Sequence, residues 1–187
     1  MITARQFYQA WLETIGNNQE KIKQYCHSKN DYTKLAIRDD ASLIIQVAKK
    51  LGLSCYNADY YSLDSVLYHE QNRVRKGNDR YHYLSHICVA FEHENDFFSG
   101  LFQEVAHLLI TQSQLKVLVS YPNSFEAKQV NQELAELHSI IADTPDSDEI
   151  SKKENFLLIL GVNKKQHSKD SWKGLIFTTE EWKELLD

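Results

Sequence analysis

The segment from residue 87 to residue 96 limits the fold more than any other stretch of the chain. It begins Ile-Cys-Val-Ala-Phe and continues Glu-His-Glu-Asn-Asp, so a short apolar run ends abruptly in acidic residues. The β-branched and aromatic members of the run, together with its length, favour a buried strand over a helix. Successive strand side chains point to opposite faces, so Glu92 and Glu94 share one face. These carboxylates repel each other, and a bound cation would relieve that repulsion.

Apolar strands and amphipathic helices alternate along the rest of the chain. The spacing of apolar residues predicts helices over residues 43–51, 101–109, 127–141 and, at the end, 179–186. The first helix begins near residue 4 and either ends at the break at 16–18 or resumes through Ile22 toward Cys26. Two short strands are expected within residues 54–68, and single strands over 81–91, 115–121, 156–162 and 172–179. This order predicts a mixed α+β fold of the α/β type, in which helices flank a central mixed sheet.

Length and composition indicate one domain that folds alone. The chain has 187 residues, of which 42% are hydrophobic and only two are proline. No stretch approaches the roughly 20 apolar residues of a membrane-spanning helix, and the polar start is unlike a signal peptide, so we expect no membrane association and a cytoplasmic protein. Cys26, Cys55 and Cys88 are odd in number and widely spaced, which argues against both a disulfide framework and a cysteine zinc site.

The charge of the chain restricts any role with nucleic acids. Its formal net charge is −5, whereas proteins that bind phosphate backbones usually carry a basic surface, so a local basic patch would be needed. The dense basic pairs, Lys152-Lys153 and Lys164-Lys165, are better explained as solvated surface. The tyrosines at positions 56, 60 and 61 could stack on bases, although packing within the sheet is favoured.

Further acidic residues are expected near the Glu92 strand. Asp64 lies on the second strand of the 54–68 region, which is predicted to be an antiparallel neighbour of the Glu92 strand. Glu104 falls beside the apolar stripe of its helix, so its carboxylate can face the sheet. Glu104 and His107 also have the spacing of a di-iron ligand pair, but that chemistry needs a second copy, which the sequence lacks. His93 should face away from the glutamates and form structural hydrogen bonds.

Several of these segments together resemble a known family. They are Leu-Asp-Ser-Val-Leu-Tyr at 63–68, Ala-Phe-Glu-His-Glu-Asn-Asp at 90–96, a helix with Glu104, and Leu-Lys-Val-Leu-Val-Ser-Tyr at 115–121. This arrangement resembles the PD-(D/E)XK nuclease superfamily, whose pattern is a helix, a three-strand meander, a helix and a fourth strand. The resemblance covers roughly residues 40–121. It implies a restriction-endonuclease-like core within a single domain of residues 1–187.

The resemblance also assigns positions in the family motif. Asp64 matches the acid of the second strand and Glu92 the first acid of the third strand, whereas Glu94 stands where the family usually has lysine. Some restriction enzymes of the superfamily carry glutamate there. Lys116, on the next strand, is the nearest replacement in sequence for the missing lysine, and Glu104 would complete or orient the site. Residues 1–30 would be a helical extension of the core, and the strands after residue 121 a C-terminal addition.

Two functions follow as expectations. The first is hydrolysis of DNA phosphodiesters, as in a restriction or repair system, with Mg²⁺ or Mn²⁺ held by Asp64 and Glu92 and with Glu94 as a ligand or base. The second is a domain of the same fold that lacks catalysis and serves as a binding or regulatory protein, which the negative charge and the absent lysine favour. A second copy of the chain or a protein partner could supply the missing basic surface.

Overall fold

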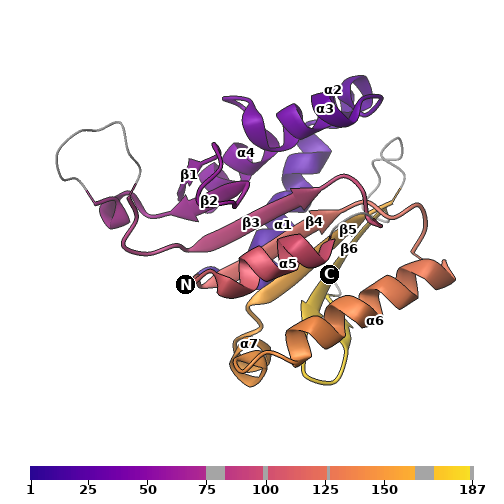
Figure 1. The fold of residues 1–187 in the computed structure, drawn as a ribbon. Helices are drawn as coiled ribbons and strands as arrows, with labels where there is room; N and C mark the ends of the chain where they lie inside the picture. Colours follow the sequence, from indigo (N-terminus) through magenta and orange to yellow (C-terminus); the bar gives the residue numbers. More distant parts are fainter. Residues whose placement is uncertain (75–82, 99–100, 126, 163–170, 186–187) are drawn as a thin grey trace.

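The computed structural model describes residues 1–187 except 75–82, 99–100, 126, 163–170 and 186–187 (Figure 1). Its strands form one seven-stranded sheet in chain order: β1 (Ser54–Tyr56), β2 (Ser65–Tyr68), β3 (Val89–Glu94), β4 (Leu115–Ser120), β5 (Phe156–Gly161), β6 (Trp172–Phe177) and β7 (Trp182–Glu184). The α-helices are α1 (Ala4–Asn17), α2 (Gln19–Tyr25), α3 (Lys29–Thr33), α4 (Leu43–Lys50), α5 (Leu101–Ile110), α6 (Lys128–Ala142) and α7 (Ser147–Lys153). A π-helical turn (Lys34–Arg38) and a 3₁₀ turn (Glu70–Asn72) complete them.

The sheet combines both kinds of strand pairing, which confirms the predicted mixed sheet flanked by helices. β1, β2 and β3 form an antiparallel meander, β3, β4 and β5 are parallel, and β6 and β7 return antiparallel. The parallel pairs require crossovers, which α5 provides between β3 and β4, and α6 with α7 between β4 and β5. The crossover helices cover one face of the sheet, and α1 and α4 cover the other (Figure 1).

Strand alternation builds a hydrophobic core on each face. On β3, Phe91 packs in the core with α1 and α4, while Ala90 belongs to the core with α5 and α6. Helix α1 begins with a capping box between Thr3 and Gln6. Its Phe7 and Trp11 rings lie 6.1 and 5.9 Å from the ring of Phe91. The N-terminal helix is therefore part of the core of the sheet.

Several predicted boundaries differ from the structure. Strand β3 begins at Val89 rather than near residue 81, and residues 81–82 lie outside the described part of the chain. Asp64 directly precedes β2 instead of lying within it. Helix α4 follows Ser42, and Asp39 ends the π-helical turn before it. Helix α7 lies between the predicted helix 127–141 and the predicted strand 156–162, and it buries Ile150 against the sheet core.

The predicted C-terminal helix is instead strand β7. Thr178 closes a tight turn, because its hydroxyl accepts hydrogen bonds from the backbone N–H groups of Glu180 and Glu181 and donates to the Glu181 carbonyl. The turn directs Trp182 back along β6, where its indole Nε1 donates to the carbonyl of Leu134 at 2.8 Å. Tertiary contacts at Trp182 thus override the local preference for a helix.

Two sequence-based expectations about the whole chain can be compared with the structure. None of the described helices is long and apolar enough to span a bilayer. Cys26, Cys55 and Cys88 are all free thiols, as their number and spacing predicted, and Cys88 is buried.

Candidate metal centre

Strand β3 carries Glu92 into the core between the sheet and α5. The alternation of β3 directs Ala90, Glu92 and Glu94 to the α5 face, and the Glu92 side chain is only 1% exposed. A carboxylate in such a position loses its hydration and needs compensating partners. The residues around Glu92 therefore decide what this site can do.

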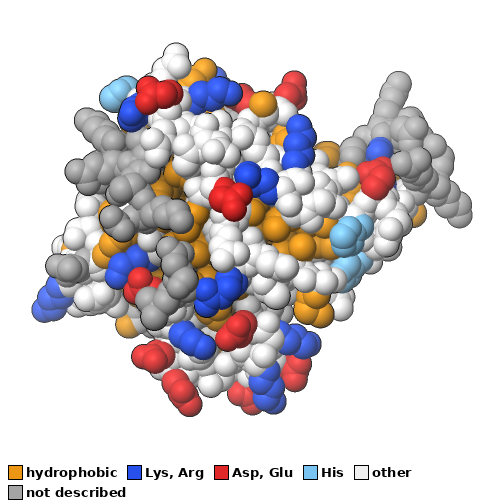
Figure 2. Space-filling view, turned by 180° about the vertical axis from the view of Figure 1, so that it is seen from behind, with side chains coloured by type: hydrophobic (Ala, Val, Ile, Leu, Met, Phe, Trp, Pro, Cys, Tyr) orange, Lys and Arg blue, Asp and Glu red, His pale blue; other side chains and the backbone are white. Residues whose placement is uncertain are grey.

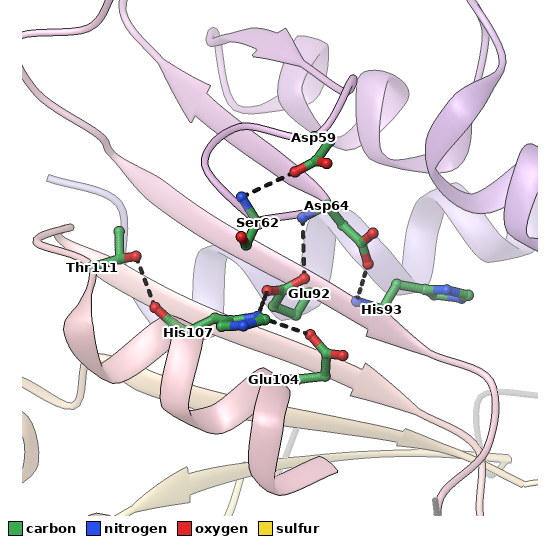
Figure 3. Close-up of polar contacts among 8 residues, drawn as sticks. All are labelled: Asp59, Ser62, Asp64, Glu92, His93, Glu104, His107 and Thr111. Carbon is green, nitrogen blue, oxygen red and sulfur yellow. Dashed lines mark hydrogen bonds and ion pairs between the residues drawn. The ribbon is translucent and has the colours of Figure 1, made fainter. Parts of the chain in front are cut away.

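Helix α5 places two such residues beside Glu92. Leu101, Val105 and Leu108 anchor the helix in the core, and Glu104 and His107, three residues apart, flank this apolar stripe. His107 Nδ1 lies 3.3 Å from Glu92 Oε1 and 3.6 Å from Glu104 Oε2 (Figure 3). One ligand atom from each of Glu92, Glu104 and His107 falls within 4.8 Å of the others. The group could therefore hold a metal ion.

Asp64 reaches the same place from the start of β2. The antiparallel register that pairs Ser65 with Phe91 puts Asp64 opposite Glu92. The backbone N–H of Asp64 donates to Glu92 Oε2 at 3.1 Å, and the backbone N–H of His93 donates to Asp64 Oδ2 at 2.9 Å (Figure 3). These reciprocal bonds fix the two carboxylates against each other. Asp64 therefore lies beside Glu92, although it is not one of the three residues whose ligand atoms fall within 4.8 Å of one another.

Burial and mutual repulsion change the protonation of these acids. Burial, followed by the charges of Glu104 and Asp64, raises the pKa of Glu92 to about 10. Burial also raises the pKa of Asp64 to about 6, and Glu104 acts in the same direction, while the His93 N–H and Arg38 oppose it. Near neutral pH, Glu92 holds a proton in the place that a metal cation would take.

Two of the expected site residues lie apart from this group. Glu94 is half-buried two residues further along β3, where its Oε1 accepts a hydrogen bond from the backbone N–H of Asp96. Lys116 is on the same face of the sheet, but it pairs with Ala90, while Glu92 pairs with Leu118. Among the described residues, no hydrogen bond or ion pair joins Lys116 to the acids. It lines a separate cavity.

His107 belongs to this group, although the sequence alone does not single it out. Its i, i+3 spacing from Glu104 is the available signal, but the sequence has no second Glu-x-x-His pair. The third member of the group is Glu92, which comes from a strand rather than from another helix. His93 behaves as predicted, since it faces away from the glutamates and its Nε2 lies 2.9 Å from the Tyr121 hydroxyl.

The loop that precedes Asp64 has an unusual backbone. Asp59, Tyr61 and Ser62 adopt positive φ angles of 54°, 52° and 71°, which non-glycine residues rarely do. An Asx-type contact from Asp59 Oδ1 to the N–H of Ser62 supports the loop (Figure 3). Tyr61 is 76% exposed, although the ring of its neighbour Tyr60 packs against Tyr56. The loop therefore presents one tyrosine to solvent, three residues before Asp64 in the chain.

No known family model, curated protein or solved structure matches this chain. Two carboxyl groups, of Glu92 and Glu104, and the His107 imidazole lie within reach of one another, and they offer oxygen and nitrogen ligands of the kind that divalent metals use.

Proposed function

We propose that this protein is a divalent-metal-dependent nuclease that hydrolyses phosphodiester bonds of DNA. The observation that carries the proposal is the meeting of Asp64 and Glu92, across two antiparallel strands, with Glu104 and His107 from the following helix. Such a group can bind a cation that neutralises the charge of a phosphodiester. A purely structural role would leave a buried glutamate beside two further acids without any gain in stability.

The arrangement of the strands supports this proposal. A helix, the meander β1–β2–β3, helix α5 and then β4 parallel to β3 follow one another along the chain. This is the order of the PD-(D/E)XK pattern that residues 40–121 resemble. Glu92 on β3 and Asp64 directly before β2 correspond to the two acids of that pattern.

The residues of the site suit distinct tasks. A divalent cation bound here supplies Lewis acidity and lowers the pKa of a coordinated water. Glu92, Glu104 and His107 would bind the cation, and the hydrogen bond from the Asp64 N–H would orient Glu92. The pKa of the Asp64 carboxyl, raised to about 6 chiefly by burial, suits a group that accepts a proton from the attacking water near neutral pH.

The donor set favours Mn²⁺ over Mg²⁺. Mg²⁺ prefers oxygen ligands and retains several waters, whereas imidazole nitrogen suits transition metals better. His107 supplies such a nitrogen between two carboxylates. We therefore expect both metals to bind, with Mn²⁺ the tighter of the two.

The face of the molecule opposite the site lacks a concentrated basic surface in the part of the chain that the structure describes. Figure 2 shows acidic and basic side chains mixed over this face. Substrate would instead approach from the side of the Asp59–Ser62 loop. Arg38 lies near enough to Asp64 to lower the pKa of the Asp64 carboxyl. Tyr61, within the Asp59–Ser62 loop, is exposed. A cation and an aromatic ring at this position suit a phosphate and a base.

The test compares wild type with Glu92→Gln, which keeps the volume and removes the charge. Calorimetry with Mn²⁺ and Mg²⁺ measures binding, and nicking of a supercoiled plasmid measures cleavage. Glu136→Gln makes the same chemical change at an exposed position of α6 and serves as the matched control. We expect loss of binding and cleavage in Glu92→Gln alone. Full cleavage by that variant would overturn the proposal.

A second function is favoured by one specific observation. Glu94 occupies the usual lysine position, and the structure places Lys116 in another cavity instead of beside the acids. A metal-binding domain that recognises a partner without cleaving DNA fits that arrangement. Metal binding without cleavage of any duplex or single-stranded DNA substrate would favour this second function.

A further inference from the structure

A cavity of about 410 Å³ lies away from the acidic group, on the same side of the sheet. The end of α5, the first residues of β4, helix α7 and Asn155 line it, and none of the candidate metal ligands is among the described residues of its wall. Its volume is within the range of about 300–1,000 Å³ that is typical of small-molecule sites. The polar side chains in its wall show which ligand would fit.

Lys116 is the first of these side chains. It is only 6% exposed, yet within the described part of the chain its amine has no hydrogen bond and no ion pair. Burial and the nearby charge of Lys153 lower the pKa of Lys116, and Asp146 opposes them. The amine lines the cavity without a partner among the described residues, so an anionic ligand in the cavity would pair with it.

Asn155 is the second. Its backbone is fully used, because its N–H donates to the Ile150 carbonyl and its carbonyl accepts from the Lys116 N–H. Its side-chain Oδ1 is buried and has no hydrogen-bond partner. Two adjacent chain segments thus place an unpaired amine and an unsatisfied amide oxygen in residues that line one cavity. A buried polar atom without a partner is rare in a folded protein.

The remaining charges of the wall limit what can bind. Lys153 is paired with Glu149 at 3.0 Å, which leaves Lys116 and Asp146 as one positive and one negative group. A dianion such as phosphate would meet repulsion from Asp146. A single carboxylate with a hydrogen-bond donor beside it would match both Lys116 and the Asn155 oxygen.

We propose that this cavity binds a small carboxylic acid that carries an amino or hydroxyl group next to its carboxylate. The carboxylate would face Lys116, the amino or hydroxyl group would donate to Asn155 Oδ1, and an apolar side chain would contact Leu109 and Ile150. The proposal is independent of the metal centre, with which it shares no residue.

The test uses three matched probes and one anion. L-leucine, its 2-hydroxy analogue and 4-methylpentanoate, which lacks the donor, are titrated into ¹⁵N-labelled protein, with inorganic phosphate as the fourth probe. We expect leucine or its hydroxy analogue to shift the backbone amide resonances of Lys116 and Asn155. Whichever of these two compounds binds more tightly shows whether an amino or a hydroxyl group is the preferred donor. The compound without a donor, 4-methylpentanoate, should bind at least about tenfold more weakly.

Variants then connect binding to the cavity. Lys116→Met keeps the length of the side chain and removes its charge, and Lys152→Met makes the same change at an exposed position of α7 outside the cavity. We expect Lys116→Met to weaken binding at least about tenfold and Lys152→Met to leave it unchanged. Asn155→Ala provides a second test should Lys116→Met fail to fold. Unchanged resonances with both acids, phosphate binding as tight as that of the acids, or wild-type affinity in the cavity variants would each overturn the proposal.

Discussion

Glu92 and His93 are neighbours on β3 and both are buried, but their side chains lie on opposite faces of the sheet and have different partners. His93 lies on the other face from α5, where its Nε2 is 2.9 Å from the Tyr121 hydroxyl and its ring is 5.8 Å from that of Tyr32 on α3. Glu92 faces α5, and the acids Glu104 and Asp64 lie near it. A hydroxyl partner stabilises a buried imidazole, whereas a buried acid beside like charges would be stabilised by a proton or a cation.

The largest expected effect comes from removing the Glu92 carboxylate. Glu92→Ala should lower the affinity for Mn²⁺ by at least about 100-fold, which corresponds to about 2.7 kcal/mol, because the remaining ligands cannot enclose the ion. The fold should persist, since the substitution removes a buried acid from between two other acids. Calorimetry measures the affinity and circular dichroism the fold. Wild-type affinity in this variant would show that Glu92 is not a ligand.

The second prediction concerns pH in the absence of metal. Because the pKa of Glu92 is raised from 4.5 to about 10, the folded chain keeps a proton that the unfolded chain releases above pH 4.5. The free energy of unfolding should therefore fall as pH rises, by up to about 1.4 kcal/mol per pH unit. Asp64 contributes in the same direction between pH 3.8 and about 6. Urea denaturation with EDTA at pH 5, 7 and 9 measures this slope.

In Glu92→Gln, the free energy of unfolding should depend much less on pH than in wild type. This variant should also be more stable than wild type at pH 9. Glu136→Gln, on exposed α6, should keep the pH dependence of wild type. Saturating Mn²⁺ should restore the stability of wild type at high pH, since the cation replaces the lost proton. An equal slope in wild type and Glu92→Gln would contradict the assigned protonation of Glu92.

A substitution beside His93 should change stability without changing metal binding. Tyr121→Phe leaves His93 Nε2 buried without its hydroxyl partner, and it also removes a hydrogen bond to Tyr32. We expect the free energy of unfolding to fall by about 2 kcal/mol while the affinity for Mn²⁺ stays unchanged. Tyr61→Phe removes a hydroxyl from an exposed ring and should be nearly neutral for stability. A parallel loss of metal affinity in Tyr121→Phe would mean that the two faces are coupled.

The pairing of acids could be predicted from sequence because it depends on strand geometry alone. The period of two on β3 separates Glu92 from His93, and an antiparallel β2 brings Asp64 opposite Glu92. Lys116 shows the limit of that logic. Its face was predictable, but its position along the sheet depends on the β3–β4 register, which pairs it with Ala90. Parallel registers are set by tertiary packing of the crossover helix rather than by a local turn.

The rotation of α5 about its own axis could not be predicted from the sequence either. Leu101, Val105 and Leu108 are buried, whereas the apolar Phe102 is 55% exposed. The helix turns so that Glu104 and His107 flank its buried residues and reach Glu92. Helical periodicity defines which residues share a face, but only packing against the sheet decides which part of that face is buried.

The smallest effect tests how this rotation shapes the site. His107→Gln replaces the imidazole nitrogen by an amide, which suits Mg²⁺ no worse but binds Mn²⁺ less well. We expect the affinity for Mn²⁺ to fall about tenfold, or about 1.4 kcal/mol, with little change for Mg²⁺, so that the preference for Mn²⁺ narrows. Calorimetric titration of both ions into wild type and variant measures the ratio. His138→Gln, on α6, is the matched control. The Nε2 atom of His138 lies 2.9 Å from the Thr178 carbonyl, and His138 is not one of the candidate metal ligands. An unchanged ratio in His107→Gln would show that the imidazole only packs beside Glu92, and the site would then be one of carboxylates alone.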